Sequence, residues 1–350
     1  MPKARQNRED AVPAVSPQDL EALMRAWRMA AGSGGLAPVS TLVERETILT
    51  FAEQRLLLAT RFLALADFAG KYTVQALANA LACQGGEPHS LWATLLLPAE
   101  GNPAAESHAL WAEMSDFAKK LEVDWRGEES RCMPAVREPL VACQMFAFLA
   151  VPRPYQPHGI QAGDQLILTK SLGDAAAALM AYAREQELSE AFDLKFAKRC
   201  QQLAGVEEAS VLAAARCAWK VNGIHALHDL FQAGLAGVLH GLLDQVNLDV
   251  EIDPAQIELL PEVKLLCEYF GVDPLTAFAP GALLIVGEPS ACEAVLGRLR
   301  LARIPARLIG RVLEAGEGRW LVDGAERIKL PRVTRDPLAA IVAPGQPAAQ

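Results

Sequence analysis

The first half of the chain alternates between short apolar runs and segments in which apolar residues recur at helical spacing. Short apolar runs beside turn residues are typical of strands, and apolar positions three and four residues apart are typical of amphipathic helices. On this basis we expect helices at 71–82 and 103–121 and strands at 47–51, 55–60, 91–97 and 139–150.

The second half begins with a turn and a buried strand at 163–170, after which the pattern becomes more helical. We expect helices at 173–185, 189–203, 206–221, 227–245, 261–270 and 291–300, the last with Ser290 as its N-cap, and strands at 248–252 and 282–286. The segments 307–313 and 319–322 are expected to pair as a hairpin. Because strands and helices do not alternate strictly, the order favours an α+β fold over a doubly wound sheet.

A proline cluster gives the clearest boundary in the chain. Three prolines and a glycine fall within 152–159, which is typical of a semi-rigid linker. A chain of 350 residues also exceeds the size at which one core usually keeps growing. We therefore expect a flexible tail and a helix in 1–35, domains at 36–151 and 160–333, and a tail at 334–350.

Composition narrows the class of protein. The net charge is −9 and the basic residues form no stripe, so a nucleic-acid partner is not expected. The seven cysteines are far apart and never form a C-x-x-C pair, which argues against a zinc site and against a disulfide framework. With no signal-peptide pattern and no run of 18 apolar residues, we expect a cytoplasmic protein without a membrane span.

Several segments carry a family resemblance. Residues 70–88 contain Gly70, Asn79 and the closing Gly85-Gly86-Glu87-Pro88, which resembles the form G-x-x-A-V-x-x-x-x-N-D-x-x-x-x-G-A-x-P. This form occurs in the aminoimidazole-ribonucleotide-synthetase-like (AIR-synthase-like) superfamily. Residues 261–275 and 281–286 are similar to the C-terminal domain of the HypE proteins of that superfamily, and 163–170 is similar to the opening of this domain in selenophosphate synthetases. Residues 133–136, M-P-A-V, stand where the family often has T-P-A-V.

The resemblance implies a two-domain α+β fold. Its N-terminal sheet-and-helix domain would form a homodimer, and ATP would bind between this domain and the α+β C-terminal domain. Family members transfer phosphate with the help of magnesium ions held by acidic side chains. The matched positions predict a catalytic Asp229 and a metal ligand at Glu46. They also predict nucleotide contacts at Glu46, Arg61, Asn79, Glu128 and Arg131, and Lys71 and Lys170 are further candidates.

The chain departs from the family pattern at several acidic positions. Arg61 and Ala80 stand where the family has aspartates, and Arg131 replaces the final acid of a G-G-H-T-E segment. Fewer carboxylates and an added guanidinium weaken a site for divalent cations, although Arg61 and Arg131 could contact phosphate directly. The alternative is that both arginines, like Lys71, are solvated or paired surface residues.

The residues around Asp229 leave further alternatives open. Of the family segment D-P-T-E-G-G only Asp229 and Gly234 remain. Asp229 with His225 and His228 could form an acid–base pair, a weak metal site or a structural hydrogen-bonded group. Lys170 and Asp164 could line the cleft or serve as turn and strand-end residues.

We therefore expect a divergent AIR-synthase-related protein with a nucleotide- or phosphate-type cleft between its domains and weakened or lost ATP-dependent phosphoryl transfer. Its partners would be a small-molecule or nucleotide ligand and a second copy of the chain. One alternative is an active ATP-dependent enzyme of the HypE, selenophosphate-synthetase or thiamine-phosphate-kinase type, with Glu46, Asn79, Glu128 and Asp229 lining the cleft. The other is a non-catalytic accessory or maturation scaffold.

Overall fold

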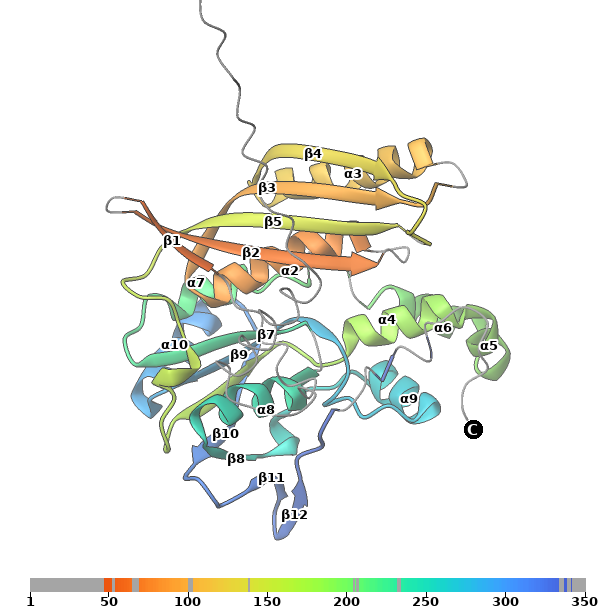
Figure 1. The fold of residues 1–350 in the computed structure, drawn as a ribbon. Coiled ribbons are helices and arrows are strands. Elements are labelled where there is room, and N and C mark those ends of the chain that lie inside the picture. Colours follow the sequence, from red (N-terminus) through yellow and green to blue (C-terminus); the bar gives the residue numbers. More distant parts are fainter. Residues whose placement is uncertain are drawn as a thin grey trace, which may run out of the picture. The chain divides into compact units, whose positions relative to one another are not determined.

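The structure, a computed structural model, divides into two compact units, Met1–Pro38 and Val39–Gln350. It describes residues 47–51, 54–64, 69–99, 103–137, 139–203, 205, 208–231, 234–333, 337–338 and 341, all in the second unit. The helix expected within 1–35, the candidate ligand Glu46 and most of the expected C-terminal tail lie outside the described residues. Two sheets and their helices make up the described part (Figure 1), which confirms the expected α+β class.

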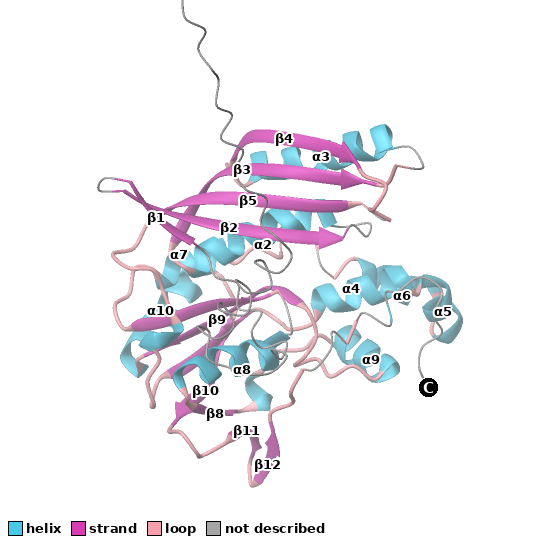
Figure 2. Ribbon diagram, viewed as in Figure 1, coloured by secondary structure: helices cyan, strands magenta, loops and turns pink. Residues whose placement is uncertain are grey.

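The first sheet has five strands in the order β1-β2-β5-β3-β4. Its strands are β1 (Thr47–Phe51), β2 (Gln54–Ala64), β3 (Gly86–Leu97), β4 (Asp124–Cys132) and β5 (Leu140–Leu149). Only β3 and β4 run parallel, and the other pairs are antiparallel. Helices α2 (Ala69–Cys83) and α3 (Pro103–Lys120) pack against one face of this sheet (Figure 2).

Burial in the five-stranded sheet follows the strand period of two. In β5, Val141, Cys143, Met145 and Ala147 are buried, whereas the residues between them are half-buried or exposed. The buried set belongs to the same apolar cluster as Leu77 and its neighbours on α2. The helices therefore cover one face of the sheet, and none of the described residues covers the other, which is called the open face below.

The second sheet has seven strands in the order β12-β11-β8-β10-β6-β9-β7. Its strands are β6 (Gln165–Thr169), β7 (Ile224–Leu230), β8 (Asp249–Ile252), β9 (Ala279–Gly287), β10 (Ala306–Leu313), β11 (Arg319–Asp323) and β12 (Glu326–Lys329). The helices of this half are α4 (Asp174–Ala183), α5 (Glu185–Ala191), α6 (Leu194–Gln201), α7 (Leu212–Ala218), α8 (Gly234–Val246), α9 (Pro261–Phe270) and α10 (Pro289–Leu301). Two short 3₁₀ turns, η2 (Pro157–Gly159) and η3 (Pro254–Gln256), complete it.

Strand β9 shows that both faces of the seven-stranded sheet are covered. Leu283 and Ile285 pack into a cluster with α7 and α10, whereas Leu284 and Val286 pack into a second cluster with α8. All four side chains are at most 2% exposed. An uninterrupted apolar sequence in a central strand is what such double coverage requires.

One apolar cluster crosses from the first sheet to the second. It contains Leu77 and Leu81 of α2, Leu95 of β3, Ala215 of α7 and Ile285 of β9. The core is therefore continuous on both sides of the proline cluster at 152–159. The domain limits 36–151 and 160–333 stay a prediction.

Two expected pairings in the second half are wrong. The segments at 307–313 and 319–322 are strands, but β8 lies between β10 and β11, antiparallel to the first and parallel to the second. The hairpin partner of β11 is β12, a strand whose charged sequence Glu-Arg-Ile-Lys hid it. Ser290 is not the N-cap of α10, because that helix begins at Pro289 and its N-cap is Glu288.

The expected helix at 227–245 is also wrong in its first part. Residues 224–230 form β7, and helix α8 begins only at Gly234. Gly234 has φ +60°, and an added Cβ would lie 2.6 Å from the carbonyl oxygens of Leu275 and Ala277, so only glycine fits at this start. Among the described helices, none is long and apolar enough to cross a membrane.

Candidate functional site

Asn79 lies at the junction of the two sheets and is completely buried. Its Nδ2 donates to the backbone oxygen of Ala209 at 2.8 Å. Its Oδ1 accepts from the backbone nitrogen of Val211 at 3.0 Å and from Nε2 of Gln75 at 2.7 Å. The amide therefore fastens α2 to the 208–211 segment, as a buried polar group must be hydrogen-bonded to be tolerated.

Arg61 and Asp229 meet at the same junction, from β2 and β7. Arg61 is 7% exposed, and its guanidinium carbon lies 5.5 Å from the centroid of the Phe231 ring. Burial raises the pKa of the Asp229 carboxyl, and the positive charges of His228 and Arg61 oppose that rise. Oδ2 of Asp229 is buried and has no hydrogen-bond partner among the described residues. An arginine at position 61 thus brings a positive charge close to a buried acid.

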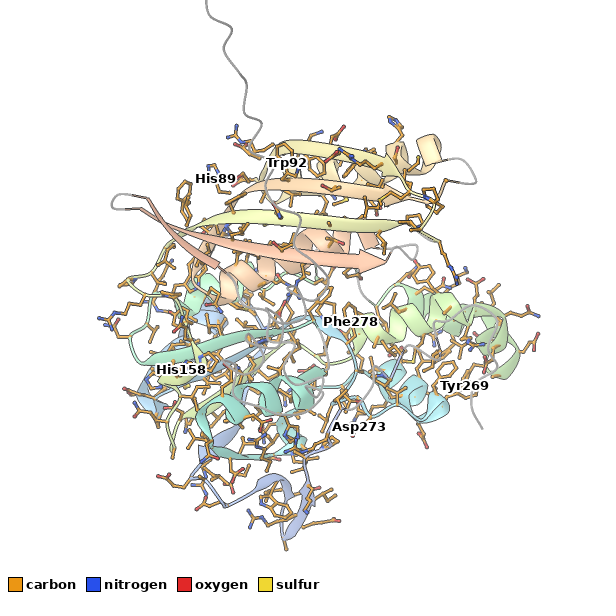
Figure 3. The ribbon with its side chains drawn as sticks, viewed as in Figure 1. His89, Trp92, His158, Tyr269, Asp273 and Phe278 are labelled. Carbon is orange, nitrogen blue, oxygen red and sulfur yellow. The ribbon has the colours of Figure 1, made fainter. Side chains whose placement is uncertain are left out.

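Aromatic side chains surround this pair, and our sequence reasoning did not single them out. The rings of Phe231 and Phe278 are 5.0 Å apart between centroids, and those of Tyr72 and Phe278 are 6.1 Å apart, both edge to face. Phe278, labelled in Figure 3, lies between α2 and the seven-stranded sheet. The only signal in the sequence was Phe231 itself, which stands where the family segment has a threonine.

Lys170 holds the 208–211 segment through two neighbouring carbonyls. The residue follows β6 in a left-handed conformation with φ +57°, and its Nζ donates to the oxygens of Glu208 at 2.6 Å and Ser210 at 2.8 Å. Burial lowers the pKa of the Lys170 ammonium, whereas the charges of Glu208 and Asp174 act to raise it. Asn79 and Lys170 therefore bind alternate groups of one short backbone segment.

A cavity of about 250 Å³ lies beside Lys170. Its charged lining consists of Lys170, Asp174, Glu208 and Glu258, and most of the remaining wall is formed by small apolar residues. The lining comes from five separate stretches of the C-terminal half, which is why no motif in the sequence pointed to it.

Glu128 and Arg131 lie apart from this junction, on the edge strand β4. Glu128 pairs with the buried Ala93 and accepts a hydrogen bond from Trp125 Nε1 at 3.2 Å, on the helix side of the sheet. Arg131 pairs with Leu96 on the open side and binds Glu129 at 2.5 Å. Three strand spacings, about 14 Å, separate β4 from β2. The structure therefore brings Arg61, Asn79, Asp229 and Lys170 together, but not Glu128 or Arg131.

The predicted contacts of Lys71 and Glu46 cannot be located, since the side chain of Lys71 and the whole of Glu46 lie outside the described residues.

His225 and His228 do not form one site. They stand on a strand, where a spacing of three does not place two residues on one face as it does on a helix. His225 Nδ1 lies 2.7 Å from Asp164 Oδ2, whereas His228 Nδ1 lies 2.5 Å from the backbone oxygen of Asp229. No group of three histidine, cysteine, aspartate or glutamate side chains suited to a metal occurs in the described part of the chain.

The comparisons with known proteins agree with this architecture. A family model described as AIR synthase related protein, C-terminal domain, matches residues 161–323. The carbamoyl dehydratase HypE of Cupriavidus necator is 26% identical over 279 residues, which cover 75% of this chain and 76% of that protein.

Two solved structures share the fold. The crystal structure of the hydrogenase maturation protein HypE in complex with ATP has a TM-score of 0.69 at 19% identity, over 89% of this chain and 95% of that one. AaThiL complexed with AMPPCP and TMP has a TM-score of 0.64 at 17% identity, over 88% and 95%. Two sheets joined through α2 and the 208–211 segment thus define a protein with the two-domain architecture of HypE and ThiL. Residues 161–323 match the AIR-synthase-related family, and the chain as a whole is similar in sequence and fold to HypE.

Proposed function

We propose that this protein binds a nucleotide- or phosphate-type ligand at the junction of its two sheets and that its ATP-dependent phosphoryl transfer is weakened or lost. Support for the ligand class comes from the similar HypE and ThiL structures, which were solved with ATP and with AMPPCP. The observation that supports the loss of phosphoryl transfer is the hydrogen bonding of Asn79. Its amide, at the position of the family's N-D pair, is committed to the backbone of Ala209 and Val211.

The described residues of the junction do not fit a magnesium ion. Hard divalent cations need several oxygen ligands. Here the oxygen of Asn79 already accepts two hydrogen bonds, Ala80 has no carboxylate, and Arg61 adds a positive charge. The remaining acid, Asp229, is fully buried with a raised pKa, which disfavours its charged form.

Calorimetry with ATP tests the proposal. We expect heat of binding that is unchanged when EDTA replaces magnesium, together with no ADP formation over several hours. Binding that requires magnesium, accompanied by ADP release, would support the alternative of an active ATP-dependent enzyme. No binding at all would support the accessory or scaffold role.

A gain-of-function variant sharpens the same test. The double substitution Arg61→Asp and Ala80→Asp restores the two aspartates that the family pattern has at these positions. We expect it to make ATP binding respond to magnesium. The matched control is Arg131→Asp, which adds an acid on the open side of edge strand β4 and is expected to leave the magnesium response unchanged.

We also propose that two copies of the chain pair through the open face of the five-stranded sheet. Trp92, Phe148 and Leu140 on this face are 47%, 38% and 37% exposed, and Trp92 is labelled in Figure 3. Exposed apolar residues that gather on one sheet face mark an interaction surface. Sedimentation of Trp92→Glu should show monomers, whereas Leu301→Glu, at a residue 87% exposed on α10, should leave the dimer intact.

A reducing compartment suits the thiols of this chain, and we propose the cytoplasm. All seven cysteines are free, and five of them are buried. Burial raises the pKa of the Cys143 thiol to about 12 and that of Cys292 to about 12, so these thiols stay protonated and unreactive. Labelling of the native protein with a maleimide should modify exposed Cys132 first.

A further inference from the structure

The densest group of positive charges in the chain lies where α10 ends and β10 begins (Figure 1). Five arginines, at 298, 300, 303, 307 and 311, occur without an acidic residue between Glu293 and Glu314. The whole chain carries a net charge of −9, so this stretch has the opposite sign to the rest of the molecule. Such a local reversal of charge needs a physical explanation, either in the fold or in binding.

Ion pairs within the fold account for two of the five arginines. Arg307 Nη2 donates to Glu258 Oε2 at 3.3 Å, and Arg311 Nε donates to Glu251 Oε1 at 2.7 Å. Arg311 and Glu251 also stand opposite each other on β10 and β8. These two arginines therefore already have partners in the chain itself.

The other three arginine side chains are exposed and bind none of the described residues: Arg298, Arg300 and Arg303. Positive charge in the last turn of a helix is favourable, and Arg298 and Arg300 occupy that turn of α10. Arg303 lies beyond the helix, in a left-handed conformation with φ +57°. The helix end therefore explains part of the positive charge, but not all of it.

Two exposed leucines belong to the same stretch. Leu301, the last residue of α10, is 87% exposed, and Leu308 on β10 is 37% exposed. Leu308 pairs with Ile167, whose side chain packs into the same cluster as Leu299 of α10. Because directly opposed strand residues share a face, Leu308 lies on the side of the sheet that α10 covers. Apolar side chains among unpaired arginines are typical of a protein-binding surface, in which arginine is enriched.

We propose that the surface formed by Arg298, Arg300, Leu301, Arg303 and Leu308, here called the arginine surface, binds an acidic protein segment in which apolar side chains stand among carboxylates. A guanidinium group pairs with a carboxylate through two parallel hydrogen bonds, so each unpaired arginine offers a site for one acidic side chain. An apolar side chain of the partner would lie against Leu301. None of these residues contributes to the junction around Asn79, so the inference goes beyond the proposed function.

Other polyanions fit these observations less well. A nucleic acid or an anionic bilayer would meet only three unpaired arginines, and the net charge of −9 repels both. A phosphate backbone offers no apolar contact to Leu301 or Leu308, and two leucines are too few to anchor a protein in a bilayer. An acidic protein segment supplies both the carboxylates and the apolar side chain.

Fluorescence anisotropy of labelled peptides mixed with the full chain tests the proposal. The probe repeats Glu-Glu-Leu three times, and its controls repeat Gln-Gln-Leu and Glu-Glu-Ser. We expect the probe to bind at least about fivefold more tightly than either control, and to weaken severalfold between about 50 and 300 mM salt, because salt screens the attraction. Equal binding of the Glu-Glu-Ser peptide, or no binding of the probe, would overturn the proposal.

Charge-reversal variants locate the binding. Arg300→Glu combined with Arg303→Glu should weaken the probe at least about tenfold, because two attractions become repulsions. The matched control combines Arg126→Glu on β4 with Arg327→Glu on β12. It makes the same change in net charge and should alter the dissociation constant less than about twofold. Equal losses in the two double variants would show that only net charge matters and would refute the site.

Leu301→Ser tests the apolar contact without a change of charge. The side chain is 87% exposed, so this variant should fold as the parent protein does. We expect it to weaken the probe at least about threefold, because the apolar area buried on binding is lost. Unchanged affinity would count against a protein segment as the partner and would overturn the proposal.

Competition experiments separate the classes of partner. Single-stranded DNA, phosphatidylserine vesicles and ATP are added in turn to the full chain with its bound probe. We expect none of them to displace the peptide when added at an equal concentration of negative charge. Displacement by DNA or by vesicles would overturn the proposal in favour of a nucleic-acid or membrane surface. Displacement by ATP would overturn it too, because the arginines would then belong to the nucleotide.

Discussion

Strands β5 and β9 are both interior strands with apolar sequences, yet their surroundings differ. In β9 neighbouring residues enter two different cores, one with α7 and α10 and the other with α8. In β5 every second residue enters a core, and those between, including Phe148 at 38% exposure, face outward. An apolar strand sequence therefore does not by itself show that helices of the same chain cover both faces of its sheet.

The largest effect should come from a truncation in the doubly covered strand. Leu284→Ala removes a completely buried side chain from β9 and should lower the free energy of unfolding by about 2–5 kcal/mol. Leu140→Ala, at 37% exposure on β5, should cost under about 1 kcal/mol in a monomeric sample. Urea unfolding of both variants measures the contrast, and equal losses would show that the open face is already covered.

The second-largest loss of stability should come from removing the Asn79 hydrogen bonds that connect α2 to the 208–211 segment. Asn79→Ala leaves the backbone nitrogen of Val211 and the oxygen of Ala209 buried without their partner, which should cost about 2–4 kcal/mol. Asn222→Ala, in an exposed turn, is the control and should stay within about 0.5 kcal/mol of the parent protein. A small loss at Asn79 would mean that α2 and the 208–211 segment are held chiefly by apolar packing.

A pH effect should follow from α8, which covers the second face of β9. Burial, and then the charge of Arg319, lower the pKa of His240, whose Nδ1 lies 2.8 Å from Arg319 Nη1. The unfolded chain then binds the proton more readily than the folded one, so stability falls as pH drops below about 6.5. His240→Gln should flatten this part of the stability profile, measured as melting temperature between about pH 7.5 and 5. A profile as steep as the parent's would assign the acid sensitivity elsewhere.

The smallest effect should come from the ion pair on the open face. Glu129 and Arg131 are mostly exposed, with side-chain exposures of 44% and 69%. Arg131→Ala should therefore change monomer stability by under about 0.5 kcal/mol. If the open face is the dimer interface, the same change should alter the dimer dissociation constant, which sedimentation at several concentrations would reveal.

The sequence was sufficient for the fold class and for strands with strong apolar patterns. The expected helix at 71–82 corresponds to α2, and the expected helix at 261–270 is α9, which ends at Gly271 with φ +65°. Strand β4 was missed because its sequence Asp-Trp-Arg-Gly-Glu-Glu-Ser-Arg-Cys is mostly polar. Polar residues are tolerated there because β4 is an exposed edge strand. Residues 227–230 of strand β7 were assigned to a helix because their apolar residues fit both periods over so short a run.

The candidate site, too, could be predicted only in part from the sequence. The resemblance placed Arg61, Asn79 and Asp229 in one cleft, and the structure brings them to one junction. It could not exclude Glu128 or Arg131, because their position depends on strand register rather than on motif spacing. The cavity was beyond sequence reasoning, since its charged groups at 170, 174, 208 and 258 meet only after the second sheet has formed.

The apolar cluster that runs from β3 through α2 and α7 to β9 has a consequence for dissection of the chain. Cleavage of the backbone within the proline cluster at 152–159 would divide that apolar cluster. Each fragment would then expose an apolar surface to water. Neither fragment should then fold alone, but the two should reassemble when mixed. The intact chain should accordingly lose both sheets in one cooperative melting transition.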